Sequence, residues 1–407
     1  MKFDTIIIGG GLSGLVTGIS LAEAGQKCLI ISAGQSALHF FSGSFELYGC
    51  DGAPLESIAA LDATHPYSKL GVEQIGRLAE QVPQFFERMN ITLRGSALRN
   101  HYRLTPLGVL KPAWLTMDEY VRVESADQMP WSRVAICDIA GFLDFQPDFL
   151  ASGLAGRGVE SKVVTISLPE LERLRNNPTE MRATNIAKVL SDDVLVRLAQ
   201  KINDACGDVD AVLMPTVVGL LEGSAVEQLR RMVDRPVQFV ATMPPSVPGI
   251  RTQITLRKRF QELGGVYMLG DTAKSGTFDG DRLTSIRTAN HGAVEFEADN
   301  FVLASGSFFS HGIVASPEHI YEPTLGLDVD AAGERSEWYE RNLFKAQPYM
   351  TFGVSTDSDF RVRKEGQTLS NVYAVGAVLS GCNPIKEGCG AGVAILTSMH
   401  VAHTILK

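Results

Sequence analysis

The sequence predicts an α/β fold in which a nucleotide-binding sheet is interrupted by an inserted α+β domain. Three observations support this. A strand, a glycine turn, a helix and a second strand follow one another in residues 1–35. A strand ending on glycine and a glycine-rich helix start return near the C-terminus, in residues 371–392. Between these two segments, short strands broken by glycine and proline begin near residue 91 and indicate a different module.

The N-terminal segment has the pattern of a phosphate-binding turn. Residues 3–8 are apolar and rich in β-branched side chains, as expected of a buried strand. A G-x-G-x-x-G motif follows through Gly9, Gly11 and Gly14. Gly9 permits the tight turn, Gly11 lets the backbone approach a phosphate, and Gly14 lets the helix lie close to the strand. A structural glycine turn in another kind of α/β sheet is the alternative interpretation.

The second strand lacks the acidic residue that normally binds the adenosine ribose hydroxyls of a dinucleotide. Ser32 stands at that position, and no Asp or Glu occurs between Glu23 and Glu46. We therefore expect the phosphate half of a nucleotide site without its adenosine half.

Composition narrows the possible functions. The chain has 407 residues, enough for two or three interleaved domains, with 45% hydrophobic and 20% charged residues. A net charge of −9 argues against nucleic acid as a main partner. The six cysteines include no C-x-x-C pair, which fits a reducing compartment and predicts no metal site. We expect no signal peptide, and no apolar run reaches the ~18 residues of a spanning helix.

Helices are predicted where apolar residues recur every three or four positions, and strands where β-branched runs are short. The expected helices are 15–24, 71–90 with Pro83 in its middle, one that begins at 147–154, 184–206, 224–233, 250–263 and 393–405. The expected strands include 28–31, 134–137, 163–166, 209–218, 266–269, 283–288 and 300–304. A stiff connector, 244–249, marks the return from the inserted domain.

Three separated pieces of the chain resemble one superfamily. They are residues 4–14, the strand at 301–306, which is similar to the alanine-threonine-glycine motif of flavoproteins, and the strand at 373–376 followed by Gly388. Together they resemble the flavoproteins that include the flavin subunits of succinate dehydrogenase and fumarate reductase. The resemblance implies a Rossmann-like FAD/NAD(P)-binding flavoprotein fold with an inserted α+β substrate or partner domain.

The predicted domain boundaries follow from this resemblance. The flavin-binding domain is expected in three parts, 1–90, 247–316 and 366–407. The inserted substrate or partner domain is expected at 91–246, with a second insertion at 317–365.

The whole chain resembles a narrower family, the B subunits of bacterial anaerobic glycerol-3-phosphate dehydrogenases. The residues that carry this resemblance are 2–14, 40–49, 245–249 with Arg251, 304–312 and 381–392. It implies an oxidoreductase that works with two partner subunits, of which one is a catalytic flavoprotein and the other a membrane-attached iron–sulfur protein. Glycerol 3-phosphate is then oxidised to dihydroxyacetone phosphate, and electrons pass to quinone, with fumarate or nitrate as the terminal acceptor. The implied location is the cytoplasmic side of the bacterial inner membrane, held there by the partner subunits.

The resemblance implies FMN as the cofactor, and two departures from the superfamily pattern bear on that. The aspartate that normally follows the last strand and binds the ribityl hydroxyls is replaced by Ala377, and Ser32 removes the adenosine clamp. FMN has no adenosine, so Ser32 favours FMN over FAD, whereas Ala377 weakens the binding of either flavin. A non-catalytic assembly or electron-relay subunit with a degenerate flavin fold is the alternative. The candidate cofactor-binding residues are Gly9, Gly11, Leu12, Ser13, Gly14, Ser32, Ser42, Gly43, Ser44, Gly306, Gly376, Ala377, Gly388, Gly390, Ala391 and Gly392.

Oxidation of a secondary alcohol needs a base for the hydroxyl proton and a cation for the phosphate. His311 is the candidate acid–base group, with His39 as a second possibility and a structural histidine as the alternative. Arg251 and Lys386 are the candidates for binding phosphate or offsetting the charge of reduced flavin. Cys382 and Cys389 are interpreted as buried thiols, with redox use as the alternative.

Overall fold

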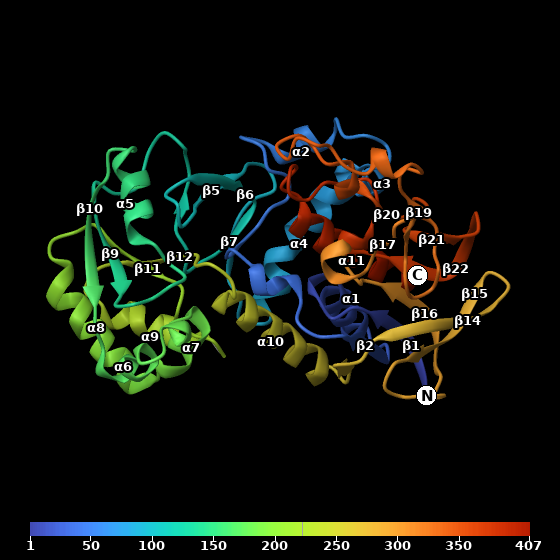
Figure 1. Ribbon diagram of the computed structural model, residues 1–407, viewed down its shortest axis with the longest axis horizontal. Helices are drawn as coiled ribbons and strands as arrows, with labels where there is room; N and C mark the ends of the chain where they lie inside the picture. The colour runs from blue at the N-terminus through green and yellow to red at the C-terminus, as the bar shows by residue number, and fades with distance from the viewer. Residues whose placement is uncertain (222) are drawn as a thin grey trace. The chain divides into compact units, whose positions relative to one another are not determined.

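The computed structural model describes residues 1–221 and 223–407. Its contacts divide the chain into two compact units (Figure 1). Unit 1 comprises Met1–Ala37, Glu46–Phe85 and Leu256–Lys407. Unit 2 comprises Leu38–Phe45 and Phe86–Thr255. The predicted insertion at 91–246 therefore lies within a somewhat longer second unit.

Unit 1 is built on an eight-stranded mixed sheet with the order β13-β2-β1-β16-β15-β14, to which β22 and β21 add beside β16. The parallel strands are β1 (Lys2–Ile8), β2 (Cys28–Ser32), β13 (Val266–Leu269), β16 (Phe296–Leu303) and β22 (Gln367–Ala374). Antiparallel strands β14 (Ala273–Asp279), β15 (Arg282–Thr288) and β21 (Arg361–Lys364) complete it. All of β2 and the last four residues of β1 are buried, as expected of parallel strands covered on both faces.

Two helices of unit 1 lie side by side, α1 (Leu12–Glu23) and α11 (Gly390–Ile405) (Figure 1). On a different side of α1, a glycine allows close packing against β2. A Cβ on Gly18 of α1 would lie 2.9 Å from both the Ile30 and the Phe260 side chains. Ser398 of α11 donates a hydrogen bond to the carbonyl of Ser13 at 3.0 Å.

The other elements of unit 1 are short, apart from two helices at its boundary with unit 2. They are α2 (Pro54–Ile58), α3 (Pro66–Leu70), η3 (Phe308–Ser310), β17 (Val314–Ala315), β18 (Ile320–Tyr321), β19 (Val329–Asp330), η4 (Arg335–Glu337), η5 (Pro348–Thr351), β20 (Gly353–Val354) and η6 (Gly376–Val378). Helices α4 (Val72–Glu87) and α10 (Val247–Glu262), and the short η1 (Ala37–Phe40), cross the boundaries between the units. Pro83 lies inside α4, as predicted.

Unit 2 contains a four-stranded parallel sheet with the order β10-β9-β11-β12 and two small antiparallel sheets. The strands of the parallel sheet are β9 (Arg133–Ile139), β10 (Glu160–Ile166), β11 (Ala211–Pro215) and β12 (Val237–Val240). The small sheets contain β3 (Ser44–Phe45), β4 (Leu93–Gly95), β5 (His101–Leu104), β6 (Leu110–Ala113), β7 (Leu115–Met117) and β8 (Arg122–Val123). The helices are α5 (Pro147–Ala155), α6 (Pro169–Arg175), η2 (Pro178–Glu180), α7 (Ala183–Val189), α8 (Asp192–Cys206) and α9 (Ser224–Met232).

Three predicted boundaries differ from the structure. The helix expected at 184–206 is two helices, because Leu190 leaves helical geometry at ψ 70° and Ser191 starts α8. Residues 317–365 belong to unit 1, not to the inserted unit, because β21 pairs with β22. The returning part of the flavin-binding domain begins at Leu256 instead of 247.

None of the described helices is both long enough and apolar enough to cross a lipid bilayer.

The stability of unit 2 is expected to depend on a buried histidine. Nε2 of His101 lies 2.6 Å from the Thr116 hydroxyl, and burial, helped by Arg122, lowers the pKa of His101 to about 4. Between pH 6.5 and 4, His101 binds a proton in the unfolded chain but stays neutral in the folded chain. We expect roughly 3 kcal/mol of unfolding free energy to be lost as the pH falls from 6.5 to 4.

Urea unfolding across this pH range measures the effect. His101→Gln should flatten the pH dependence, while His403→Gln, a change at an exposed histidine, should leave it unaltered. An unchanged slope in His101→Gln would show that other groups carry the pH dependence.

Candidate functional site

The turn after β1 brings three pieces of backbone into contact. Gly9 has a φ of +121°, and a Cβ there would lie 2.1 Å from the carbonyl oxygen of Ala304 at the end of β16. A Cβ on Gly14 would lie 1.9 Å from the carbonyl oxygen of Gly9. Both glycines are therefore required by the packing of the chain itself.

Gly11 is different, because the chain leaves room for a side chain there. Its φ of −83° suits any residue, and a Cβ would meet only the Ser36 Cβ at an ordinary 3.5 Å. Gly11 is also the N-cap of α1, and no side chain caps this helix end and no acidic residue lies in its first turn. The first amides of α1, at Leu12 and Ser13, therefore lie at a helix end that no side chain caps, the kind of end that can bind an anion.

The edge of this turn next to β2 is occupied by side chains. The Tyr267 hydroxyl donates to the carbonyl of Gly10 at 3.1 Å, and the Ser32 hydroxyl donates to the carbonyl of Gly34 at 3.2 Å. A Cβ on Gly10 would lie 2.1 Å from the Tyr267 oxygen and 2.5 Å from the Ser32 oxygen. Sequence reasoning missed Tyr267, because β13 is adjacent to β2 only in the folded sheet.

The ends of β16 and β22 form the next part of the site. Gly306 and Gly376 have φ values of +82° and +73°. A Cβ on Gly376 would lie 2.1 Å from the Ser13 hydroxyl oxygen, so the end of β22 touches the first turn of α1. The Ser305 hydroxyl oxygen is buried and has no hydrogen-bond partner among the described residues.

The start of α11 supplies a second uncapped helix end. Gly388 has a φ of +55°, and Cys389 is the N-cap, with no side chain capping the helix. Gly390 borders a cavity, whereas the amide of Gly392 donates to the Glu46 carbonyl at 2.9 Å. Gly392 therefore serves packing, whereas Ala391 is not among the residues that line the cavity.

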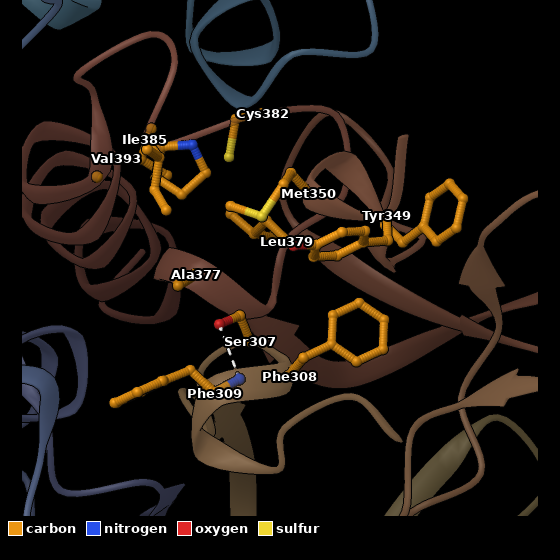
Figure 2. A pocket seen from close by; sticks show the side chains of 13 residues that line it. Ser307, Phe308, Phe309, Tyr349, Met350, Ala377, Leu379, Cys382, Ile385 and Val393 are labelled. Carbon is orange, nitrogen blue, oxygen red and sulfur yellow. Dashed lines mark hydrogen bonds between the residues drawn. The ribbon is translucent and has the colours of Figure 1, made fainter. Parts of the chain in front are cut away.

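The cavity has a volume of about 540 Å³ and mostly apolar walls (Figure 2). That volume lies in the range of small-molecule and cofactor sites. Ala377 is in its wall, next to Gly376, and offers no polar side chain. The lining residues are Ser307, Phe308, Phe309, Tyr349, Met350, Phe352, Ala377, Leu379, Cys382, Pro384, Ile385, Gly390 and Val393.

These features fit a flavin that has a phosphate at one end. The uncapped start of α1 suits the phosphate, and the apolar cavity suits a flat aromatic ring. The start of α11 suits the ring's electron-rich carbonyl edge. The Ser32 edge offers no carboxylate to an adenosine ribose.

Two of the three candidate catalytic residues are exposed on unit 1. His311 follows η3 in the left-handed conformation, with a φ of +59°. Lys386 lies in the loop before α11, where its amide donates to the Asn383 side chain at 3.0 Å. Among the described residues, no hydrogen bond joins His311 to Lys386.

Arg251, the third candidate, is buried in unit 2. Its guanidinium forms an ion pair with Glu119 and donates to the carbonyl of Gly219 at 2.9 Å. The Arg251 side chain is 6% exposed, so its charge is already neutralised inside the protein. The structure therefore corrects the prediction, and gives Arg251 a role in holding unit 2 together.

The predicted loop at 42–44 also lies in unit 2. The Ser44 hydroxyl is 2.8 Å from that of Thr116, and a Cβ on Gly43 would lie 2.5 Å from the Tyr120 ring. Burial lowers the pKa of His39, partly offset by a hydrogen bond with Gln253. Ser44 and Gly43 are thus used in internal packing, while Ser42 is only half-buried.

Known proteins match the chain over its full length. Residues 4–393 match the family described as FAD binding domain. The B subunit of anaerobic glycerol-3-phosphate dehydrogenase from Yersinia enterocolitica is 45% identical, over 100% of this chain and 99% of the relative. Proteins of the same name from Yersinia pseudotuberculosis and Pectobacterium atrosepticum are 42% and 41% identical, with the same coverage.

Among solved structures, 3-ketosteroid Δ1-dehydrogenase from Sterolibacterium denitrificans is 11% identical, with a TM-score of 0.46 over 99% of each chain. The family match confirms the predicted flavoprotein fold and supports a flavin cofactor.

Gly11→Ala should separate cofactor binding from folding. The chain has room for the methyl group, whereas a phosphate against the α1 amides does not. We expect the bound flavin to fall about tenfold or more while the melting temperature of the flavin-free chain changes little. Absorbance at the flavin band and calorimetry measure the two effects.

Gly9→Ala is the matched control, because its methyl group would collide with Ala304. It should lower the melting temperature of the flavin-free chain. Equal flavin content in Gly11→Ala and the natural chain would contradict the assigned phosphate site.

Arg251→Ala should destabilise unit 2. It leaves Glu119, whose side chain is only 11% exposed, without its partner, and breaking a buried pair in this way typically costs about 3–5 kcal/mol. Urea unfolding measures the loss, and the double change Arg251→Met with Glu119→Leu should recover most of it. Unchanged stability combined with lost substrate oxidation would restore Arg251 as a substrate-binding cation.

Proposed function

Because the chain belongs to the family formed by the B subunits of anaerobic glycerol-3-phosphate dehydrogenase and has an FAD binding domain, we propose that it is a flavin-holding subunit of that enzyme. The reaction would convert sn-glycerol 3-phosphate to dihydroxyacetone phosphate. It removes two electrons and two protons, and a bound flavin supplies the two-electron acceptor.

The observation that carries this proposal is the uncapped start of α1 at Gly11. The chain has no packing reason for glycine there, and no side chain caps the first amides of α1. The cavity beside the start of α11, in the same unit, provides the matching place for an apolar ring.

We propose FMN as the cofactor, with FAD as the alternative. At the end of β2, Ser32 bonds within its own turn, and Tyr267 contacts Gly10 beside it. A charge-assisted bond to a ribose hydroxyl, worth about 1.5–3 kcal/mol, is therefore missing on the adenosine side. FMN has no adenosine, so the missing bond does not weaken its binding.

For the chemistry around the flavin, His311 is our proposed acid–base group and Lys386 our proposed phosphate-binding cation. Both are exposed side chains on unit 1, one following β16 and the other preceding α11. The proposed partners are two further subunits of the same complex, a catalytic flavoprotein and a membrane-attached iron–sulfur protein. Electrons would pass through them to quinone at the cytoplasmic face of the inner membrane.

A second candidate function is a non-catalytic assembly or relay subunit with a degenerate flavin fold. Ala377 favours it, because that wall of the cavity lacks the usual carboxylate for ribityl hydroxyls. The intact turn at Gly9, Gly11 and Gly14 opposes it.

Heat release of the cofactor distinguishes these functions. We expect about one FMN per chain in the purified protein, because the site offers binding energy for phosphate and ring but not for adenosine. Chromatography of the supernatant identifies the flavin. FAD would overturn the FMN assignment, and no flavin in either the free or the assembled chain would favour the second candidate.

Anaerobic addition of glycerol 3-phosphate to the assembled complex then tests the function itself. Bleaching of the flavin held by this chain is expected in the natural complex. A complex in which this chain carries Gly11→Ala should lose that bleaching signal. Full reduction of quinone by the Gly11→Ala complex would show that the flavin of this chain is not on the electron path.

A further inference from the structure

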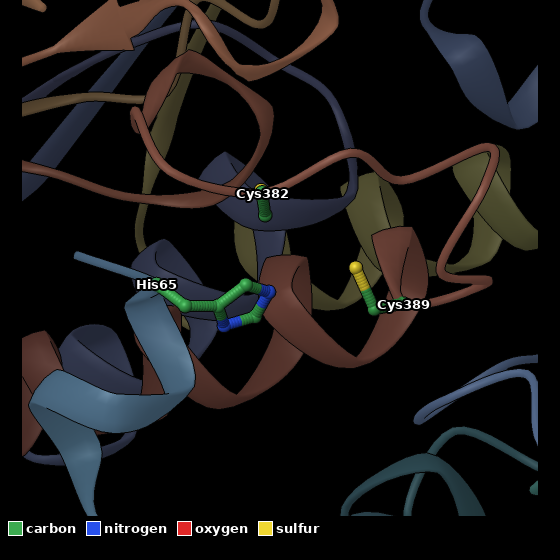
Figure 3. Close-up of side chains that lie close together, drawn as sticks. All are labelled: His65, Cys382 and Cys389. Atoms are coloured by element: carbon green, nitrogen blue, oxygen red, sulfur yellow. The ribbon is translucent and has the colours of Figure 1, made fainter. Parts of the chain in front are cut away.

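Four polar side chains from distant parts of unit 1 meet beside the cavity. His65 precedes α3, Cys382 lies in the loop after η6, and Cys389 caps α11. One ring nitrogen of His65 and the two sulfur atoms all lie within 4.8 Å of one another, and the three residues are buried (Figure 3). Oε2 of Glu387 is 3.3 Å from His65 Nε2 and 3.5 Å from Cys389 Sγ.

The hydrogen bonds fix where the protons are. Nδ1 of His65 accepts from the Tyr67 amide at 3.0 Å, at the start of α3. Burial lowers the pKa of His65, so the ring is neutral and its single proton is on Nε2. His65 Nε2, the Asn383 amide at 2.9 Å and the Cys389 thiol therefore all donate to the Glu387 carboxylate.

This arrangement disfavours a metal ion. A histidine that binds a metal through Nε2 carries its remaining proton on Nδ1 and donates it to an acceptor. Here Nδ1 of His65 faces the donating amide of Tyr67. With a metal on Nε2, the proton on Nδ1 would point at the N–H of Tyr67. The only other possibility is that the ring loses both protons and becomes an imidazolate.

The two thiols differ in access. Cys382 lies in the wall of the cavity, where Figure 2 shows its sulfur pointing inward. Cys389 is fully buried, and its hydrogen bond to Cys382, burial and the charge of Glu387 all raise its pKa, so it keeps its proton.

We propose that Cys382 and Cys389 are a reversible redox pair that exchanges with low-molecular-weight disulfides entering the cavity. Cys382 gives up its proton to solvent and attacks one sulfur of the disulfide, which forms a mixed disulfide and releases one thiolate. Cys389 then attacks the Cys382 sulfur and releases the second thiolate. The proton of Cys389 passes to Glu387, which is 22% exposed and returns it to solvent or to the leaving thiolate.

The geometry permits this ring closure. The two sulfurs lie within 4.8 Å of each other and must approach to about 2.05 Å. Glycines with positive φ stand at both ends of the intervening loop, Gly381 at +90° and Gly388 at +55°. Oxidation would tie the cavity wall to the N-cap residue of α11 and so couple the redox state to the shape of the site.

The test uses the full-length chain in mixtures of 2-mercaptoethanol and its disulfide, followed by acid quenching, alkylation and mass spectrometry. Cys382 and Cys389 should lose alkylation together, with the slope of a two-electron couple, about 30 mV per tenfold change in the equilibrium constant. Cys389→Ser should trap a mixed disulfide on Cys382, and Cys382→Ser should leave Cys389 unreacted. Cys50→Ser, a nearby half-buried cysteine, is the matched control and should leave the pair's titration unchanged.

Glu387→Gln tests the proton acceptor. The mixed disulfide on Cys382 should resolve about 10²-fold more slowly near pH 7, and raising the pH should restore the rate. Three outcomes would overturn the proposal. They are independent titration of the two thiols, one equivalent of bound zinc in the purified chain, or an unchanged rate in Glu387→Gln.

Discussion

Unit 1 depends on one close backbone approach, where the turn after β1 meets the end of β16 and the start of α1. No side chain fits at Gly9 or Gly14, because carbonyl oxygens lie about 2 Å from where the Cβ atoms would be. This contact sets the direction of α1. As a result, the uncapped start of α1, and not a packed side chain, faces the edge of the sheet where the parallel strands end.

The parallel direction of the strands extends this constraint to the rest of the site. The carboxyl ends of β1, β16 and β22 lie at one edge of the sheet, so Gly9, Ser305 and Gly376 come together from distant parts of the sequence. Contact between Gly376 and Ser13 links the turn to the cavity wall. The uncapped start of α1, the apolar cavity and the two cysteines thus belong to one framework.

Local pattern was enough to predict the first turn, the missing acid at Ser32 and the glycine-rich start of α11. It was not enough for features made by long-range contacts. His65 and Glu387 are 322 residues apart, and nothing in either segment marks the pairing. Arg251 shows the same limit. The sequence around it, an arginine after a proline-rich connector, is the same whether the side chain binds substrate or pairs with Glu119, which is 132 residues away.

The central claim is that this chain binds a flavin chiefly through its phosphate and ring. Fluorescence titration of the flavin-free chain with riboflavin, FMN and FAD tests it most directly. FMN should bind about 10–10²-fold more tightly than riboflavin, since the α1 amides gain charge-assisted bonds to the phosphate. FAD should bind no more tightly than FMN. Equal affinity for riboflavin and FMN would contradict the account.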